Sequence, residues 1–282
     1  MPLTYDSNIL EDSISPMGIR LTTFEVTFPR FILAEFNTHR ALSRNSASSR
    51  AIPPELQIER VLESPFIPEF GTRTKGMGSG APNKSQDKAV YAWLKSRDMA
   101  VEAAQDLIDL DVDKARINRL LEPFMWHTVI ATATRWGNFF SLRTDEDAQP
   151  EFRIVALMMQ EQYKENVPEF KGVADQHLPL VQEHDKMSVP ASAWAPISSG
   201  RCARVSFDKH NVNEPYQNSL DRHTLLTNNG HWSPTEHQGI VMSSEEEAAP
   251  FHGNFHGDWA QYRKTFLYED DFTWLKKSME NA

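Results

Sequence analysis

Cysteine, long hydrophobic runs and positive charge are all scarce in this sequence. Its single cysteine, Cys202, excludes an intramolecular disulfide and a zinc site built from several cysteines. No apolar run approaches the roughly 20 residues that cross a bilayer, and the first residues, M-P-L-T-Y-D-S-N, lack the basic and apolar regions of a signal peptide. The net charge of −10 argues against binding duplex nucleic acid through the overall field. We therefore expect a cytoplasmic protein that binds neither nucleic acid nor a membrane.

Several common catalytic signatures are absent as well. The sequence has no Ser-His-Asp signature, no G-x-G-x-x-G and no P-loop lysine motif. It also has no repeats of fixed period, no low-complexity tail and no obvious linker. With 282 residues, 40% hydrophobic and 24% charged, the chain has the composition of a soluble globular protein, and we expect one domain over residues 1–282.

The stretch with the clearest chemical character is residues 35–53, E-F-N-T-H-R-A-L-S-R-N-S-A-S-S-R-A-I-P. It carries His39, three arginines and four serines, and no acid follows Glu35 within it. Guanidinium groups and short hydroxyls are the donors that a phosphate or pyrophosphate needs, and consecutive small residues let backbone N–H groups face an anion. On composition alone, an exposed serine-rich loop explains the stretch equally well.

The hydrophobic pattern predicts a mixture of strands and helices. Residues 20–30 alternate, are rich in Thr, Val and Phe, and indicate a strand that ends at Pro29. Residues 64–84 are typical of a long loop, residues 238–242 of a strand, and residues 199–207 form a short piece in which apolar and polar residues alternate. Helices are predicted at residues 85–110, 113–121, 127–142 (a buried one), 151–165 and 213–229.

A second polar constellation lies at His231, Glu236 and His237. The spacing offers three metal ligands, but helical zinc sites place their ligands three or four residues apart, and Pro234 intervenes. A metal hydrolase is therefore a weak alternative. The structural interpretation is a Ser-Pro-Thr-Glu capping box that opens a helix, with Glu236 reaching back to Ser233.

Three other side chains have plain structural interpretations. An arginine at position 143, after an apolar segment, is commonly an ion-pair partner, here for Asp145 or Asp147. Arg119 on a short helix is commonly solvated. Cys202, in an apolar piece, is expected to be a buried small side chain and not a nucleophile.

Three motifs nevertheless resemble those of the flavin-dependent thymidylate synthases. T-H-R-A-L-S-R-N-S-A-S-S-R, residues 38–50, is similar to the family pattern Arg-His-Arg, seven residues, Ser, with His39, Arg40 and Ser48 in the matching places. A-R-V-S-F at residues 203–207 and G-H-W-S-P-T-E-H at residues 230–237 are similar to a family pair of motifs that a helix separates. N-F-F-S-L-R-T-D-E-D-A-Q, residues 138–149, is similar to the end of a family helix.

The order of these motifs differs from that of the family. The motifs at residues 203–207 and 230–237 precede the Arg-His-Arg strand in the family, whereas here they follow it. The chain therefore resembles a circular permutant, of a phage-type variant in a host cytoplasm, and permutation is tolerated where the original termini lie close together. The implied fold is α+β, with an antiparallel or mixed sheet and long helices, plus a C-terminal extension from about residue 243. The aromatic residues of that extension are expected to pack over the permuted junction or to extend a subunit interface.

The resemblance implies reductive methylation of dUMP to dTMP. FAD would carry the hydride, 5,10-methylenetetrahydrofolate would donate the carbon and NADPH would be the reductant, in a homotetramer with shared active sites. Arg143 would be catalytic by stabilising negative charge on the uracil, and His231 would be catalytic beside the flavin. The residues implied to bind FAD are His39, Arg40, Asn45, Asn138, Ser206, Ser233 and Glu236. Those implied to bind the nucleotide are Glu35, Ser46, Ser48, Ser49, Arg50, Arg143 and Arg119, the last at its phosphate.

The sequence also departs from the family at several of these places. Thr38 replaces the first arginine of Arg-His-Arg, while Glu35, Ser46, Thr132, Thr134 and Asp147 replace a glutamine, a glutamate, an asparagine, an arginine and a histidine. Two alternatives therefore stay open. One is a related hydroxymethylase acting on dUMP or dCMP with the same cofactors, and the other is a non-catalytic nucleotide-binding homologue.

Overall fold

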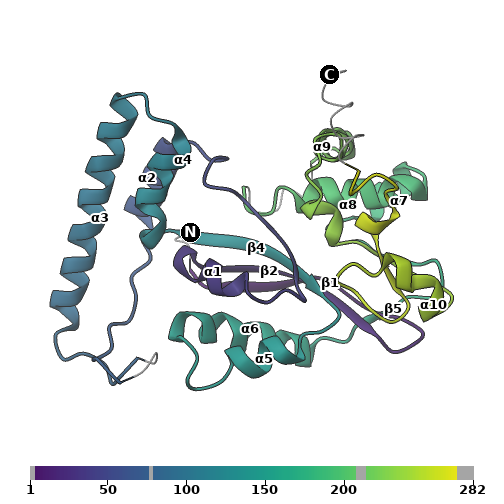
Figure 1. Cartoon of the computed structure of the whole chain (residues 1–282), viewed down its shortest axis with the longest axis horizontal. Coiled ribbons are helices and arrows are strands. Elements are labelled where there is room, and N and C mark those ends of the chain that lie inside the picture. Colours follow the sequence, from purple (N-terminus) through teal and green to yellow (C-terminus); the bar gives the residue numbers. More distant parts are fainter. Residues whose placement is uncertain (1–3, 76–78, 208–213, 272–282) are drawn as a thin grey trace.

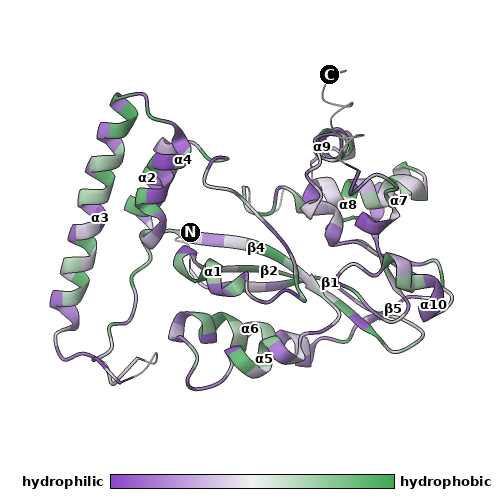
Figure 2. Cartoon of the chain, viewed as in Figure 1, coloured by the Kyte–Doolittle hydropathy of each residue, from purple (hydrophilic) through white to green (hydrophobic). Residues whose placement is uncertain are grey.

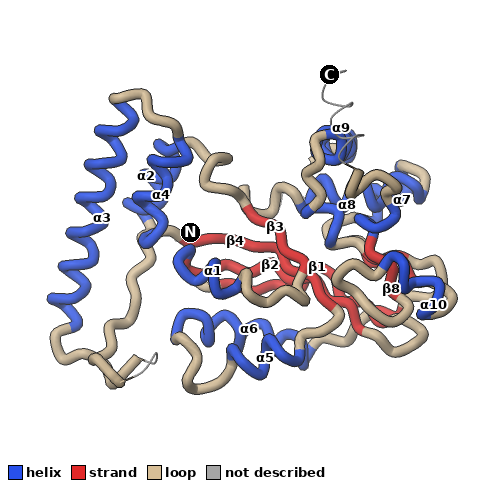
Figure 3. The backbone as a smooth tube through the Cα atoms, viewed as in Figure 1, coloured by secondary structure: helices blue, strands red, loops and turns tan. Residues whose placement is uncertain are grey.

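The strand predicted at residues 20–30 is confirmed and becomes the central strand of the molecule. The structure, a computed structural model, describes residues 4–75, 79–207 and 214–271. Strand β2 (Arg20–Pro29) is buried on both faces, and it ends where Pro29 has no N–H to donate to a further ladder bond. It lies in a five-stranded sheet of order β3-β4-β2-β1-β5 (Figure 1, Figure 3). The other strands are β1 (Asp6–Ile14), β3 (Ser43–Ser46), β4 (Trp126–Ala133) and β5 (Glu169–Phe170).

The sheet is mixed, as predicted for the fold class. β1 pairs antiparallel with β2, and β4 pairs antiparallel with both β2 and β3, while β5 runs parallel to β1. A second sheet has the order β6-β7-β8, with β6 (Gln176–His177), β7 (Gly239–Val241) and β8 (Trp259–Gln261). It packs on the first through Leu21, Trp259 and Phe255, and β7 confirms the strand predicted near residues 238–242.

The prediction of one buried helix over residues 127–142 is wrong. The segment forms strand β4, then a turn, and then helix α5 (Gly137–Arg143). The run T-V-I-A-T-A-T is rich in β-branched residues, which fit a strand better than a helix, and its apolar character reflects burial in a sheet that is covered on both faces. Apolar residues in a short run do not distinguish a buried strand from a buried helix.

The remaining described helices are α1 (Leu33–Phe36), α2 (Pro54–Glu63), α3 (Gln86–Asp109), α4 (Lys114–Leu121), α6 (Pro150–Glu165), α7 (Glu183–Ser188), α8 (Trp194–Cys202), α9 (Tyr216–Asn228) and α10 (Glu245–Ala248). Four of them, α3, α4, α6 and α9, match predicted ones, and the other five were not predicted. Short 3-10 helices are η1 (Arg30–Ile32), η2 (Glu122–Phe124), η3 (Ala191–Ala193), η4 (Ser233–Glu236), η5 (Ala249–Phe251) and η6 (Tyr262–Thr265). The predicted start of α9 at Asn213 lies outside the described residues.

One smaller prediction is also wrong, and one sequence pattern has no matching strand. The alternating residues 199–207 form the end of α8 and the turns that follow it. The capping box at Ser233 does not form, because Trp232 is the N-cap of η4, no side chain caps it, and Ser233 Oγ donates to Asn45 instead.

The helices are arranged in three groups around the sheet (Figure 1). Helices α5 and α6 cover one face, where Phe139 and Phe152 pack against Phe24 and Phe28 of β2. The other face carries α8, whose Cys202 packs with Ile130 of β4. Helices α2, α3 and α4 form an arm beside the sheet with its own apolar cluster, and both hydrophobic and hydrophilic residues recur along α3 (Figure 2).

The C-terminal extension packs on the protein's own elements. Tyr262 and Phe266 stack against His223 of α9 and Trp232. No helix among the described residues has the length and apolar character needed to span a membrane. Cys202 is fully buried as predicted, and burial raises the pKa of its thiol to about 12, which suits a packing residue.

Candidate functional site

The segment of residues 35–50 is built around an internal arginine. Arg44 Nη1 donates hydrogen bonds to the carbonyl oxygens of Asn37 (2.8 Å) and His39 (2.9 Å), and a longer one to that of Phe36. Carbonyls at the end of α1 lack helical partners, so the guanidinium satisfies them and fixes the turn into β3. One of the three arginines of the predicted anion loop therefore holds the loop itself.

The first pocket, here called the His39 pocket, brings together four of the predicted residues. It is lined by His39 and Arg40 from the turn after α1, by Asn138 and Arg143 from α5, and by Arg135, and it encloses about 200 Å³. None of the described residues that line it carries a carboxylate. Arg40, Arg135 and Asn138 are exposed at the rim, whereas His39 is buried. Three guanidinium groups without an acid in the lining make this pocket suitable for an anion.

Arg143 is anchored by His39 and not by an acid. Its Nε donates to His39 Nε2 at 2.8 Å, and its guanidinium carbon lies 4.4 Å from the centre of the Phe152 ring. Within the part of the chain that the structure describes, Arg143 forms no ion pair with Asp145 or Asp147, so the predicted ion pair is absent. Burial, with smaller contributions from the charges of Arg143 and Arg44, lowers the pKa of His39 to about 4. The imidazole is therefore neutral near pH 7 and accepts at Nε2.

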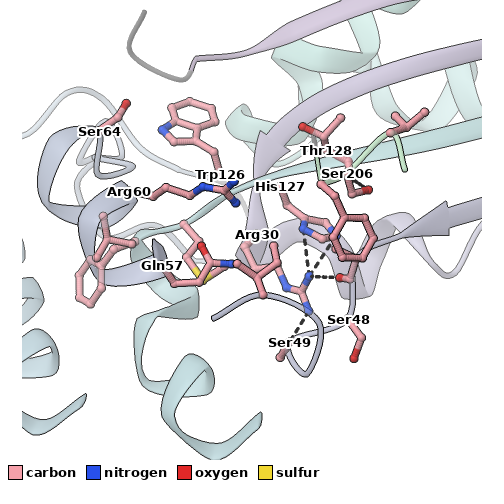
Figure 4. A pocket seen from close by; sticks show the side chains of 17 residues that line it. Arg30, Ser48, Ser49, Gln57, Arg60, Ser64, Trp126, His127, Thr128 and Ser206 are labelled. Atoms are coloured by element: carbon pink, nitrogen blue, oxygen red, sulfur yellow. Dashed lines mark hydrogen bonds between the residues drawn. The ribbon is translucent and has the colours of Figure 1, made fainter. Parts of the chain in front are cut away.

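A second pocket, here called the Arg30 pocket, is lined by the turn that follows β3, by α2 of the arm and by the start of β4 (Figure 4). Its lining includes Ser48, Ser49 and Ser206, which come from two of the three motifs, together with Arg30, Arg60 and His127, which come from none. The Nη1 atom of Arg30 lies 3.0 Å from both ring nitrogens of His127. Burial first, and then the charge of Arg30, lowers the pKa of His127 to about 3, so this imidazole is neutral too.

The turn that carries Ser49 is held rigidly. Asn118, fully buried on α4, donates from Nδ2 to the carbonyl oxygens of Ser49 (2.7 Å) and Ile52 (2.9 Å). Ser49 Oγ donates to Glu122 Oε1 at 2.6 Å, and Arg119 lies 3.8 Å from the same oxygen. Arg119 is solvated, as its structural interpretation predicted, but it stands near the edge of the Arg30 pocket through Glu122.

The remaining residues predicted to bind the nucleotide differ in exposure. Ser48 and Arg50 are exposed, and the N–H of Arg50 donates to Ser48 Oγ. Ser46 lies on β3 and is half-buried, while Glu35 is exposed on α1 and its charge acts on Arg143. Among the predicted nucleotide residues, Ser48 and Ser49 line the Arg30 pocket and Arg143 lines the His39 pocket. The other four line neither pocket.

Asn45 on β3 joins the three distant parts of the resemblance. Its Nδ2 donates to the carbonyl oxygen of Cys202, next to the A-R-V-S-F motif, at 3.1 Å. Its Oδ1 accepts from Ser233 of the G-H-W-S-P-T-E-H motif at 2.9 Å, while Ser206 Oγ donates to the carbonyl oxygen of Thr128 on β4 at 2.6 Å. These motifs pack against β3 and β4 although they come more than a hundred residues after β3, which is consistent with the permuted order.

Glu236 and His231 take different positions around this junction. Glu236 forms an ion pair with Arg263 of the C-terminal extension at 2.5 Å, and Gln261 Nε2 donates to the Glu236 carbonyl oxygen. The side chain of His231 is exposed and does not line either pocket. Among the described residues, no three His, Cys, Asp or Glu side chains are grouped to hold a metal ion, which removes the geometric basis of the metal-hydrolase alternative there.

Two of the family departures are used inside the chain. Thr132 Oγ1 lies 2.9 Å from His237 Nδ1 and 2.7 Å from Thr23 Oγ1, and Thr23 Oγ1 lies 2.8 Å from His177 Nε2. Thr134 Oγ1 lies 2.5 Å from Nδ1 of His256 in the C-terminal extension. Threonines at these places therefore bind the chain's own histidines.

Sequence reasoning missed Arg30, Arg60, His127, Arg135 and Arg263. Arg135 could have been identified from the sequence, because it follows an apolar run and lies three residues before the motif at residues 138–149. The other four carry no local signal, since each is a single polar residue whose role depends on what the fold places beside it.

These features define a class: a mixed α+β protein with two arginine-lined pockets whose described lining residues include no acid. The sequence profile of the family described as "Thymidylate synthase complementing protein" matches residues 11–169. Since the match spans more than half of the chain, this protein belongs to that family. The matched residues contain the Arg-His-Arg-like motif together with strands β2 and β4, which precede and follow it along the chain. They end before α8, α9 and η4.

Solved structures provide further likenesses. The chain is similar to a UMP/dUMP methylase PolB from Streptomyces cacaoi bound with 5-Br UMP, at 18% identity and a TM-score of 0.48, over 57% of this chain and 88% of that one. It is also similar to the same methylase bound with 5-Br dUMP, at 20% identity and a TM-score of 0.43, over 51% of this chain and 65% of that one. A search of curated proteins gives no match.

Proposed function

We propose that this protein is a flavin-dependent thymidylate synthase that converts dUMP to dTMP, with 5,10-methylenetetrahydrofolate as carbon donor and NADPH as reductant. Family membership gives the reaction class. The observation that carries the finer proposal is the junction at Asn45, where one side chain ties the Arg-His-Arg-like segment to the regions of the two C-terminal motifs, 203–207 and 230–237. Motifs that share one chemistry are expected to meet in space even when their order along the chain is changed.

The residues of the His39 pocket fit the pyrophosphate part of FAD, and the rest of the cofactor would extend beyond its volume of about 200 Å³. A dinucleotide needs cationic donors for its pyrophosphate and an apolar wall for its ring, and the pocket offers Arg40, Arg135 and Asn138 beside Phe139 and Leu142. In the proposal, FAD supplies the hydride when it is bound. By contrast, Asn45, Ser206, Ser233 and Glu236 do not line this pocket and already have partners within the chain. In the proposal they hold together the segments around the site.

Arg143 is the residue that we propose acts on the pyrimidine. Its guanidinium is held from one side by neutral His39 and lies over the Phe152 ring. It has no carboxylate partner among the described residues, so its charge is available to a ligand. A fixed positive charge lowers the energy of a uracil ring that gains negative charge during reaction, and no enzyme thiol needs to attack the base, which agrees with the burial of Cys202.

The site is spread over separate pockets of one chain. We propose that a homotetramer completes it, with FAD and dUMP shared between subunits, as the resemblance implies. Size-exclusion chromatography with light scattering tests the assembly: a tetramer agrees with the proposal, and a monomer that is fully active contradicts it.

Flavin spectroscopy followed by product analysis tests the function. The purified protein is expected to be yellow or to become so with FAD, and its reduced flavin should be reoxidised by dUMP plus methylenetetrahydrofolate with formation of dTMP. A protein that cannot be reconstituted with FAD contradicts the proposal. The mass of the product from one turnover separates methylation from hydroxymethylation of dUMP or dCMP.

A further inference from the structure

We propose that the Arg30 pocket is the subsite for the phosphate group of the nucleotide, with Arg60 and Arg30 as its cationic residues. The proposal rests on the nucleotide-methylating function proposed above. It adds residues that lie outside all the sequence motifs, because Arg30 belongs to η1 and Arg60 to α2.

Arg60 is a guanidinium without an ion-pair partner among the described residues. It is half-buried and extends from α2 toward the middle of the pocket (Figure 4). It forms no hydrogen bond with any residue that the structure describes, the exposed Glu59 acts on it only through its charge, and none of the described lining residues of the pocket is acidic. Burial lowers the pKa of Arg60, and an anion bound beside it would offset that cost of desolvation.

The neutral groups in the pocket add donors of the same kind. Gln57 is only 3% exposed, yet its amide makes no hydrogen bond with a described residue. Ser48 Oγ accepts from the Arg50 N–H and so keeps its own proton to donate. Arg60, Gln57 and Ser48 therefore offer unused donors, and a phosphate, which brings only acceptor oxygens when ionised, matches that set.

Arg30 adds a second charge that is only partly compensated. Its Nη2 lies 3.3 Å from Glu122 Oε1, and the same oxygen also accepts from Ser49. Its Nη1 rests against His127, which stays neutral. The pocket thus presents two guanidinium groups with one carboxylate behind one of them, an arrangement that suits an anion.

The size of the pocket decides which part of the nucleotide enters. It encloses about 120 Å³, below the roughly 300–1,000 Å³ of cavities that enclose a whole drug-sized ligand. A tetrahedral phosphate fits this space, whereas a complete nucleotide does not. The sugar and base would extend past Ser48, which is exposed at the pocket.

Thermal unfolding of the full chain with inorganic phosphate tests the subsite directly. Phosphate is expected to raise the melting temperature of the wild type and to have no effect on Arg60→Gln. Arg60→Lys should keep part of the effect, because it retains the charge without the planar fork. Arg116→Gln is the matched control, since Arg116 is 76% exposed and pairs with Asp113 on the outside of α4. A wild type that phosphate does not stabilise, or equal stabilisation of Arg60→Gln and Arg116→Gln, would overturn the proposal.

Kinetics separates this proposal from the proposed function. In Arg60→Gln, KM for dUMP should rise by roughly tenfold or more, while kcat stays within about twofold because Arg60 does not touch the base. Unchanged KM with normal turnover overturns the subsite and leaves the function standing. Arg60-dependent stabilisation by phosphate in a protein without any turnover supports the subsite and rejects the proposed function.

Discussion

The buried histidines predict that the protein loses stability in mild acid. His177 and His237 are fully buried. Burial is the main cause that lowers the pKa of both below the ordinary value of 6.5, to about 3 for His237. In the unfolded chain both imidazoles take up a proton as the pH falls through about 6.5, whereas in the folded protein they stay neutral. Their contribution to stability is therefore complete above pH 6.5 and is lost as the pH falls below it.

The geometry of the network explains why the folded protein resists protonation. His237 Nδ1 contacts Thr132, but His237 Nε2 is buried and has no partner among the described residues. The least costly neutral form leaves the lone pair on Nε2 and donates from Nδ1 to Thr132. The hydroxyls of Thr132 and Thr23 then pass the bonds on to His177, whose Nδ1–H donates to Ser13. Protonation of His237 would bury both a charge and an unsatisfied N–H.

The magnitude follows from proton linkage. Each histidine that is protonated only in the unfolded chain lowers the free energy of unfolding by about 1.4 kcal/mol per pH unit. His177 and His237 together therefore contribute a slope of about 2.7 kcal/mol per pH unit between roughly pH 6 and pH 4.

Urea unfolding at several pH values from 7.5 to 4.5 compares the slopes of wild type and variants. His39, His127 and His223, whose pKa values burial also lowers, add to the slope of each protein alike. His177→Gln is expected to be less stable at pH 7.5 but to lose about 1.4 kcal/mol per pH unit of slope. His231→Gln, which removes an exposed imidazole, is the matched control and should keep the wild-type slope. If His177→Gln keeps the wild-type slope while remaining folded at pH 7.5, the reasoning about the network is refuted.

Three further variants test close packing, the C-terminal extension and the catalytic arginine. Gly200→Ala should lower the free energy of unfolding by roughly 3 kcal/mol, because a Cβ at that position overlaps the backbone of α9. Gly137→Ala is the control and should be tolerated, because a Cβ there meets nothing within 4 Å. Equal melting temperatures of the two variants would contradict the close contact between the helices. Arg263→Ala removes the ion pair to Glu236. We expect the free energy of unfolding to fall by about 1–3 kcal/mol and FAD to bind more weakly in a flavin titration. If stability and FAD affinity are both unchanged, the C-terminal extension does not support the site. Arg143→Ala should reduce dTMP formation by about 100-fold or more with FAD still bound, and wild-type turnover would exclude the proposed role.

Local pattern was sufficient where one physical signal dominated. The strand at residues 20–29 shows a clear alternation, and the helix at residues 86–109 has regular apolar spacing. The segment at residues 127–142 failed because its run of apolar and small residues lacks the alternation that identified β2, although both strands are largely buried. Its β-branched residues favoured the strand, but they compete with an apolar run that a buried helix would also show.

The residues of the candidate site also fall into those that local motifs identify and those that only the tertiary structure identifies. His39, Arg40, Asn138 and Arg143 could be named from motifs, and the structure brings them into one pocket. Arg60 could not be named, because its importance lies in the absence of a partner around it, which depends on how α2 packs beside β4.

The sequence by itself determined the family and the main chemical groups. It did so because those residues occur in fixed local spacings, which survive even a change in motif order. The tertiary structure alone decided that Asn45 ties the distant motifs together, that Thr132 belongs to a buried chain of histidines, and that Arg30 and Arg60 face one acid-free cavity. These are relations between side chains far apart in the chain, and they arise only when the sheet, the arm and the C-terminal extension pack against one another.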